Sequence, residues 1–334
     1  MPTLKPLADQ VIVITGASSG IGLVTARAAA RAGAKVLMVA RSEATLQSLV
    51  GELESEGGIV AAKAADVGDA ASVKAAADHA VARFGRIDTW VNCAGVAVYG
   101  RLLDVPDDEH EQLFRTNYFG VVHGCRAAVP HLREQGGALI TVGSIASDMP
   151  SPIMGAYSAS KHAVKAFVEV LRMELAAAGA PISVTLVKPS GIDTPIGQHA
   201  ANHEPGEAQI PPPVYDPQLV ADAILACAVR PIREVTVGGA GRAEALFAAH
   251  FPALYERLAP WMARSFLDKR KAQPVPSNLP ASVRTGEERS GEHPHARRTS
   301  LYTAASLHPR TTAAVGIGGL ALAAAGLAMR RRAA

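Results

Sequence analysis

A tyrosine and a lysine four residues apart, Tyr157 and Lys161, have the clearest capacity for acid–base chemistry in this sequence. They lie in Tyr157-Ser-Ala-Ser-Lys161, where a helix is expected to begin, and this spacing places both on one helix face. A phenol with a pKa of about 10 exchanges protons poorly near neutrality, whereas an adjacent ammonium stabilises the phenolate and lowers that pKa. As an isolated pair, the two residues also fit an ordinary helix with an exposed lysine and a half-buried tyrosine.

Two further polar side chains are candidates for the same chemistry. Ser144 ends an expected strand upstream of Tyr157, and its hydroxyl can donate to the oxygen that the tyrosine protonates. Asn117 stands in an apolar helical stretch, where asparagine has no propensity reason to occur. A buried amide there can bond to backbone and hold a water. A strand-end serine and a plain core hydrogen bond remain the alternatives.

A glycine-rich turn, Thr15-Gly-Ala-Ser-Ser-Gly-Ile-Gly22, follows the first expected strand and opens a helix. Glycines let the backbone approach a pyrophosphate, and a helix N-terminus supplies N–H donors and a positive dipole. An ordinary tight turn is the alternative, and the placement between strand and helix argues against it. We therefore expect a dinucleotide to contact the residues of this turn, Gly16, Ser18, Ser19, Gly20, Ile21 and Gly22.

The end of the second expected strand bears on the choice of cofactor. A carboxylate there binds the ribose hydroxyls of NAD and repels a 2′-phosphate. This chain has Ala40-Arg41-Ser42 instead. Arg41 can pair with the 2′-phosphate of NADP(H) through charge-assisted hydrogen bonds, and Ser42 can add another. A solvated arginine is the alternative, so the missing acid is the stronger half of the argument.

The ends of the third and fourth expected strands carry further candidates for the cofactor site. Asp66 and Val67 end the third strand, where a carboxylate can accept from the adenine amino group. Asn92-Cys-Ala-Gly95 ends the fourth, and its small residues, Ala94 and Gly95, leave room for adenosine. Asp66 is equally explained as a helix cap and Asn92 as a turn residue.

Apolar runs alternate with Ala-rich helical stretches along the chain, which predicts a doubly wound parallel sheet. The fold class is therefore α/β, a three-layer Rossmann-like domain of about seven strands with a C-terminal tail. Helices are expected at about 22–32, 43–56, 69–84, 108–133 and 155–178. The expected strands are Val11–Ile14, Lys35–Val39, Ile59–Ala64, Thr89–Asn92, Gly137–Val142, Ser183–Val187 and Glu234–Val237.

Three changes of composition divide the chain. Residues 195–217, rich in Pro, Gly, Asn and His, interrupt the alternation as an irregular insertion at the mouth of the sheet. Residues 1–267 form the predicted catalytic domain, and 268–310 read as a flexible, Pro-rich charged linker. Residues 311–334 form an apolar Ala/Gly-rich tail that ends in three arginines.

Charge and cysteine usage narrow the function classes. Residues 268–334 contain eleven Lys/Arg against four Asp/Glu, so the chain's charge of +3 comes from the tail and the body is mildly acidic. We expect no nucleic-acid partner for the body. The three cysteines form no metal or redox motif. The first residues lack the pattern of a secretory leader, a basic segment followed by an apolar one, which predicts a cytoplasmic location.

The tail suggests membrane contact. Residues 311–329 are uncharged, at the short end for a bilayer span, and rich in small residues. A full span with the arginines in the cytoplasm places the body outside, which fits NADPH poorly. A shallow or hairpin-like insertion keeps both ends cytoplasmic. A low-complexity disordered tail is the alternative.

The motifs fall in order along the chain and together closely resemble the short-chain dehydrogenase/reductase family over about residues 8–240. The Ala-Arg-Ser at 40–42 is similar to the NADP-preferring members. One departure is visible, since the family's Pro-Gly after the sixth strand is here Pro189-Ser190, with Gly191 one place later. The resemblance rests on residues 15–22, Asp66, residues 92–95, Asn117, Ser144, residues 157–161 and residues 189–194.

The resemblance implies a role for each matching residue. Tyr157 acts as acid/base, and Lys161 lowers its pKa and binds the nicotinamide ribose hydroxyls. Ser144 orients the substrate oxygen, and Asn117 anchors a proton-relay water. Around Pro189, Ile192 and Thr194 contact the nicotinamide carboxamide.

The expected reaction is NADP(H)-dependent interconversion of a carbonyl and a secondary alcohol on a small molecule, with hydrophobic ones favoured. Family members are often dimers or tetramers built on the helices near 108–133 and 155–178, so a homodimer or homotetramer is expected. A non-catalytic nucleotide-binding regulator or scaffold is the rival. A hydrolase is a distant third, since Ser144 lacks a GxSxG elbow. His199 and His203 are interpreted as loop residues, not metal ligands.

Overall fold

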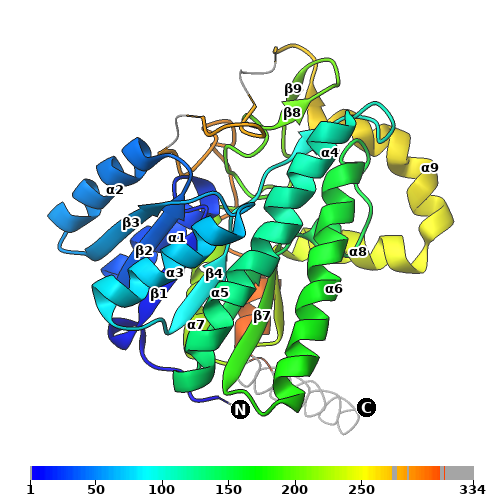
Figure 1. The fold of residues 1–334 in the computed structure, drawn as a ribbon. Helices are drawn as coiled ribbons and strands as arrows, with labels where there is room; N and C mark the ends of the chain where they lie inside the picture. Colours follow the sequence, from blue (N-terminus) through cyan, green and yellow to red (C-terminus); the bar gives the residue numbers. More distant parts are fainter. Residues whose placement is uncertain (1, 273–276, 284–285, 309–311, 313–334) are drawn as a thin grey trace, which may run out of the picture.

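A seven-stranded parallel sheet forms the centre of the computed structural model, which describes residues 2–272, 277–283, 286–308 and 312 (Figure 1). Its strand order is β10-β7-β6-β4-β1-β2-β3, and every neighbouring pair is parallel. This order confirms the doubly wound α/β fold. The strands are β1 Val11–Thr15, β2 Lys35–Ala40, β3 Ile59–Ala64, β4 Thr89–Asn92, β6 Gly137–Val142, β7 Ile182–Pro189 and β10 Glu234–Val237.

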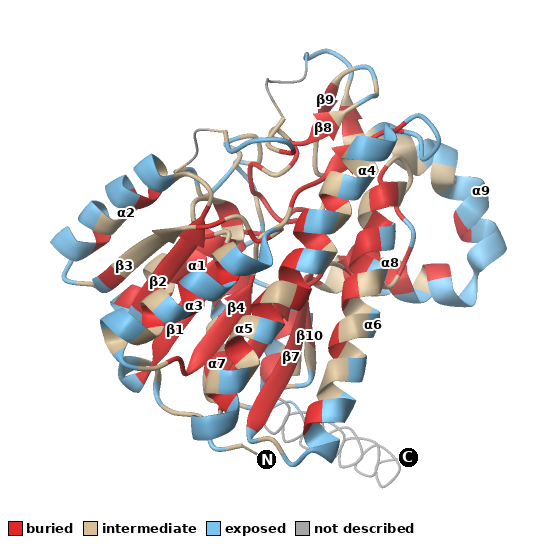
Figure 2. Cartoon of the chain, viewed as in Figure 1, coloured by how far each residue is buried: buried red, intermediate tan, exposed pale blue. Residues whose placement is uncertain are grey.

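The central strands are apolar along their whole length because helices cover both faces of the sheet. Figure 2 shows the strands buried and the outer faces of the helices exposed. One face packs against α1 Gly20–Arg31, α2 Glu43–Ser55 and α7 Pro217–Val229. The other packs against α3 Ala70–Phe84, α5 Gly120–Gln135 and α6 Gly155–Ala177.

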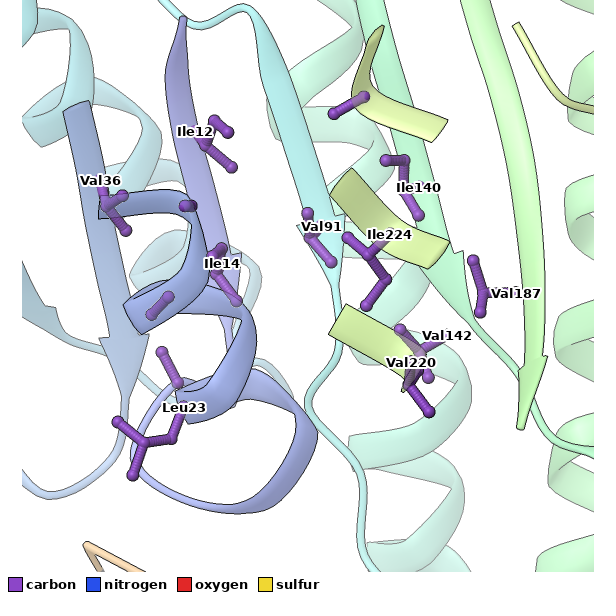
Figure 3. Close-up of a cluster of buried hydrophobic side chains, with 14 of the residues drawn as sticks. Ile12, Ile14, Leu23, Val36, Val91, Ile140, Val142, Val187, Val220 and Ile224 are labelled. Atoms are coloured by element: carbon purple, nitrogen blue, oxygen red, sulfur yellow. The ribbon is translucent and has the colours of Figure 1, made fainter. Parts of the chain in front are cut away.

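Close packing between β1 and the helices α1 and α7 fixes the edge of the sheet where the glycine-rich turn begins. Ile12 and Ile14 project from β1 toward one face and are fully buried, together with Leu23 of α1 and Ile224 of α7 (Figure 3). Full burial of a side chain of this size stabilises the fold by about 1.5–3 kcal/mol. The turn after β1 is thus held on a rigid base.

Side-chain caps define where several helices start. Asp69 accepts hydrogen bonds from the Ala71 and Ser72 amides at the start of α3. Asp216 accepts from the Gln218 amide, and Pro217 occupies the first turn of α7, where its missing N–H costs nothing. These caps satisfy amides that have no partner within the helix.

The helix expected at 108–133 is divided in the structure. It consists of α4 Asp107–Phe114, a wide π-helical turn over Arg115–Phe119 and α5. The apolar spacing continues through the junction, so the sequence pattern does not reveal the extra residue in the turn. The wide turn contains Asn117, and such turns often occur at functional sites.

The insertion at 195–217 contains two short strands, β8 Ala201–Asn202 and β9 Glu207–Ala208. They pair with β5 Val98–Tyr99 and β11 Leu267–Asp268, respectively. After β10, helices α8 Gly239–His250 and α9 Pro252–Ala263 project beside α6 (Figure 1). The insertion and these helices frame the carboxyl end of the sheet.

The described residues of the segment expected to be a linker lie against the domain. Residues 277–283 and 286–300 cross the carboxyl ends of the strands, and α10 Leu301–Leu307 packs beside β10. There, Thr303 accepts a hydrogen bond from the Gly238 amide at 3.0 Å. The apolar tail at 311–334 lies outside the described residues, apart from Thr312. Within the described ranges, no helix has the length and apolar character needed to cross a membrane.

Candidate active site

The glycine-rich turn after β1 sits tightly against the end of β4. A Cβ at Gly16, whose φ is +69°, would lie 2.7 Å from the Ala94 Cα atom, and one at Gly22 would lie 2.1 Å from the Gly16 carbonyl oxygen. Only glycine fits at these two places. Thr15 adds to the junction, since its hydroxyl accepts from the Cys93 and Ala94 amides at 3.0 and 3.2 Å.

Ser144, Tyr157 and Lys161 come together where β6 ends and α6 begins. Ser144 is the N-cap of a short 3-10 helix, Ile145–Ser147, and its hydroxyl accepts from the Ala146 amide at 3.1 Å. The same hydroxyl is hydrogen-bonded to the Tyr157 phenol. The Lys161 ammonium donates to the Val142 carbonyl at 3.2 Å and lies 5.6 Å from the centre of the Tyr157 ring.

Burial dominates the electrostatics of this group. Burial raises the pKa of Tyr157 above its usual value, and the hydrogen bond with Ser144 opposes that rise. Burial also lowers the pKa of Lys161 to about 8. Burial is therefore the largest influence on the Tyr157 pKa in this structure, and its direction is opposite to the lowering expected from Lys161.

Asn117 connects the loop after β4 to the first turn of α6. Its side-chain oxygen accepts from the Val96 amide at 2.9 Å, and its nitrogen donates to the Val96 carbonyl at 3.0 Å and to the Ser160 hydroxyl at 3.1 Å. Ser160 in turn donates to the Tyr157 carbonyl at 2.7 Å. The buried amide therefore holds the turn that carries Tyr157.

A charge cluster fixes the turn that follows Ser144. Asp148 contacts Lys165 at 2.6 Å and is bonded to the fully buried Lys188, which also contacts Glu234 at 2.6 Å. Burial alone would raise the pKa of Asp148, but its two lysine partners hold it below the usual value. Sequence reasoning missed this cluster, whose members are distant in the chain.

The predicted cofactor residues line one cavity of about 220 Å³ at the carboxyl end of the sheet. The cavity extends from Arg41 to the catalytic group, so one elongated ligand can reach both. Its lining includes Gly16, Ser18, Ser19, Gly20, Ile21, Gly22, Arg41, Ser42, Asp66, Val67, Ala94, Gly95, Tyr157, Lys161, Pro189, Ile192 and Thr194, with Ser144 beside them.

Asn92 is the exception among the predicted cofactor residues. Its side chain is buried under the sheet end, where its oxygen accepts from the Trp90 indole at 2.8 Å. Its nitrogen donates to the Cys125 sulfur at 3.5 Å and the Thr141 hydroxyl at 3.4 Å. As the last residue of β4 it points into the core, so its role here is to join β4 to α5 and β6, and its side chain does not line the cavity.

The two residues after β2 differ in how their polar atoms are used. The Ser42 hydroxyl caps α2 by accepting from the Thr45 amide at 3.3 Å. Burial lowers the pKa of the Arg41 guanidinium, and the nearby Asp66 carboxylate opposes this. Asp66 itself accepts from the Gly68 amide at 2.8 Å, whereas Asp69 is the residue that caps α3, so the helix-cap alternative does not describe Asp66.

Several cavity residues were not predicted as site residues. Cys93 is one, and burial raises the pKa of its thiol to about 12, so the thiol stays protonated. Ser190, which replaces the glycine of the family's Pro-Gly, is another. Glycines at 238 and 241 leave room for its side chain, since a Cβ at Gly241 would lie 2.5 Å from the Ser190 Cβ. The remaining ones include Thr116, Ile196, His199, Asn278, Ser282 and Val283.

The residues present fit a dinucleotide. The Ser190 hydroxyl and the Asn278 side-chain oxygen are buried without a hydrogen-bond partner in the described ranges, and both residues line the cavity. The Lys161 ammonium carries three N–H donors, and among the described residues it donates to one acceptor, the Val142 carbonyl. The N-terminus of α1 faces this cavity and suits an anion, although the amide of its first residue, Gly20, donates to the Glu287 carbonyl in this structure.

The two histidines of the insertion, His199 and His203, lie in different surroundings in the structure. His203 contacts Glu109 at 2.8 Å, and His199 lines the cavity, where burial lowers its pKa. In the part of the chain that the structure describes, no group of three or more His, Cys, Asp or Glu side chains is arranged to hold a metal ion.

Comparisons with known proteins agree with this geometry. The sequence profile described as short chain dehydrogenase matches residues 10–205. The chain is 42% identical over 331 residues to the uncharacterized oxidoreductase YxnA of Bacillus subtilis, covering 96% of this chain and 92% of the relative. It is 38% identical over 244 residues to the probable oxidoreductase EphD of Mycobacterium tuberculosis, but spans only 41% of that protein. It is also 36% identical over 223 residues to 11-beta-hydroxysteroid dehydrogenase A of Sesamum indicum, covering 66% of this chain and 63% of the relative.

Solved structures show the same fold. An alcohol dehydrogenase from the archaeon Thermococcus sibiricus, complexed with 5-hydroxy-NADP, is 28% identical with a TM-score of 0.60, covering 68% of this chain and 95% of that one. A short chain dehydrogenase/reductase from Burkholderia phymatum in complex with NAD is 26% identical with a TM-score of 0.64, covering 82% of this chain and 99% of that one. The chain therefore belongs to the short-chain dehydrogenase/reductase family of NAD(P)(H)-dependent oxidoreductases.

Proposed function

We propose that this protein is an NADP(H)-dependent oxidoreductase that interconverts a carbonyl and a secondary alcohol, with Tyr157 as the acid/base. The observation that carries the proposal is the placement of the Ser144 hydroxyl, the Tyr157 phenol and the buried Lys161 ammonium at one end of a cavity. The other end of that cavity begins at Arg41 and the glycine-rich turn.

Each side chain has a distinct role. When bound, the nicotinamide cofactor supplies the hydride. Tyr157 donates its proton to the substrate oxygen in reduction and removes it in oxidation. Ser144 donates a second hydrogen bond to that oxygen and orients it. Lys161 binds ribose hydroxyls and stabilises the phenolate form of Tyr157, and Asn117 holds the proton-relay water while fixing the tyrosine's helical turn.

The preference for NADP(H) rests on Arg41. The two residues directly after β2 are Arg41 and Ser42, neither of which offers a carboxylate to ribose hydroxyls, and both line the cavity there. A guanidinium pairs strongly with a phosphate. The similar solved structures include one with an NADP derivative and one with NAD, so Arg41 is the basis of this assignment.

The surroundings of Tyr157 favour an apolar substrate. Its ring borders a cluster that contains Tyr99, Met154, Ile196 and Phe266. One similar protein is a hydroxysteroid dehydrogenase, whose name denotes a large apolar alcohol. We propose a substrate in which the reacting carbonyl is attached to an apolar ring or chain.

A homodimer or homotetramer is the proposed assembly. Exposed apolar side chains lie on the outer helical layer: Phe119 before α5, and Val170 and Met173 on α6. Burial of these side chains against a second copy would remove apolar surface from water.

NADPH consumption with a panel of steroids, retinoids, keto-acyl thioesters and small ketones tests the proposed activity. Wild type is expected to oxidise NADPH with at least one apolar carbonyl compound. Tyr157→Phe is expected to bind NADPH and to lose nearly all turnover. A wild type that binds NADPH and turns over no carbonyl or alcohol would favour the alternative, a nucleotide-binding scaffold.

A further inference from the structure

A segment from beyond β11 covers the adenosine end of the cavity. We call its described residues, 277–283 and 286–300, the C-terminal strap. Figure 1 shows it in orange above the carboxyl ends of the central strands. Its first part is held on one side by the His199 carbonyl, which accepts a hydrogen bond from the backbone N–H of Asn278 at 2.8 Å. On the other side lies Arg41, the residue expected to bind the 2′-phosphate.

The strap is fastened at several separate points. The Glu287 carbonyl accepts from the Gly20 amide at 2.9 Å, at the start of α1. The Ser290 hydroxyl donates to the Asp193 carboxylate at 2.5 Å. The Arg289 guanidinium pairs with Asp216 at 2.9 Å. These contacts join the strap to three different elements around the cavity mouth, so it is part of the folded domain.

The contact with Arg41 orients its guanidinium. Its two terminal nitrogens donate to the carbonyls of Asn278 at 2.5 Å and Leu279 at 3.4 Å. Leu279 is 2% exposed and packs with Val96 and Val105, which fixes this part of the strap. A guanidinium has five N–H donors, so three remain for a phosphate. The strap therefore positions Arg41 without using all of its donors.

The side-chain oxygen of Asn278 is buried without a hydrogen-bond donor among the described residues. Asn278 lines the cavity beside Arg41, Ser42 and Asp66. A buried acceptor without a donor is unfavourable unless a ligand supplies one. Adenosine offers donors of this kind, in its ribose hydroxyl and its amino group.

We propose that Asn278 is a cofactor-binding residue, which accepts a hydrogen bond from the adenosine half of the dinucleotide, and that the strap forms one wall of that subsite. The inference rests on the proposed function, because it assigns the ligand of the same cavity. The strap lies beyond residues 10–205, which the family profile matches. The alignment with the Bacillus subtilis relative covers 96% of this chain and extends into the strap region.

Calorimetric titration with the two halves of the cofactor tests this role. Asn278→Ala is expected to weaken binding of adenosine 2′,5′-bisphosphate and of NADPH by about tenfold, the effect of one lost hydrogen bond in a buried site. Binding of reduced nicotinamide mononucleotide is expected to stay within about twofold of wild type. Asn202→Ala is the matched control, because Asn202 lies in β8 and its side chain donates to the Gly206 carbonyl, away from the cavity lining.

A second variant separates the acceptor from the side-chain shape. Asn278→Asp keeps the acceptor and adds a negative charge beside the 2′-phosphate subsite. It is expected to bind adenosine 5′-monophosphate within about threefold of wild type and the 2′,5′-bisphosphate at least about tenfold more weakly.

Three results would overturn the assignment of Asn278. They are unchanged binding of the bisphosphate to Asn278→Ala, an equal loss for reduced nicotinamide mononucleotide, or an equal loss in Asn202→Ala. Each of these leaves the proposed function standing if wild type binds NADPH. A wild type that binds no nicotinamide dinucleotide would instead reject the proposed function itself.

Discussion

Replacement of the buried lysine, Lys161→Met, should separate stability from activity. The folded protein holds the Lys161 pKa at about 8, against 10.5 for an unperturbed lysine. At pH 7 the ammonium is charged in both states, so its burial costs about 3 kcal/mol of folding free energy. The variant avoids this cost, but it also loses the hydrogen bond to the Val142 carbonyl, which lowers its stability by about 1–3 kcal/mol. We expect the variant to be as stable as wild type or up to about 2 kcal/mol more stable, and inactive.

The pH dependence gives the sharper readout. Between pH 8 and 10.5 the unfolded chain retains the lysine proton that the folded chain has released, so wild-type stability rises with pH. Lys161→Met lacks this gain. Urea unfolding without cofactor should show wild type gaining about 2 kcal/mol relative to the variant between pH 7 and pH 10. Lys74→Met, at an exposed position on α3, controls for loss of a lysine. Parallel pH profiles for wild type and Lys161→Met would refute the reasoning.

Three other substitutions test separate parts of the site. Arg41→Ala should weaken NADPH binding by about 10- to 100-fold, the loss of a charge-assisted pair, and NADH binding by less than about threefold; an unchanged preference removes the phosphate role. Asn92→Ala should lower the free energy of unfolding by about 1–3 kcal/mol because the Trp90 indole loses its acceptor, with the NADPH dissociation constant unchanged. Ser144→Ala should reduce kcat by about 100-fold with little change in NADPH affinity, as measured by steady-state kinetics and titration; an equal loss of NADPH affinity contradicts its role at the substrate oxygen.

The strands of the central sheet could be predicted almost to the residue. Runs such as Val11-Ile-Val-Ile14 are apolar at every position because helices cover both faces of the sheet. A short, fully apolar run of this kind is typical of a buried parallel strand. The glycine-rich turn was equally predictable, since close backbone contacts at Gly16 and Gly22 leave no alternative residue. The strands of the sheet and the glycine-rich turn can therefore be predicted from local sequence alone.

What could not be predicted depends on contacts between distant residues. The wide turn around Asn117 has the same apolar spacing as a regular helix. The Tyr157 pKa follows from burial by β5 and the insertion, which a helical spacing does not report. Asn278 lies in a Pro-rich stretch without a periodic pattern, so nothing local connects it with Arg41.

Deuteride transfer tests the central claim most directly. Wild type would be incubated with a carbonyl substrate from the panel and NADPH deuterated at the transferring position of the nicotinamide, and the alcohol product analysed by mass spectrometry. The account predicts one deuterium on the carbinol carbon with wild type, and almost no labelled alcohol with Tyr157→Phe at saturating NADPH. Labelled alcohol formed by Tyr157→Phe at the wild-type rate would contradict the role of Tyr157.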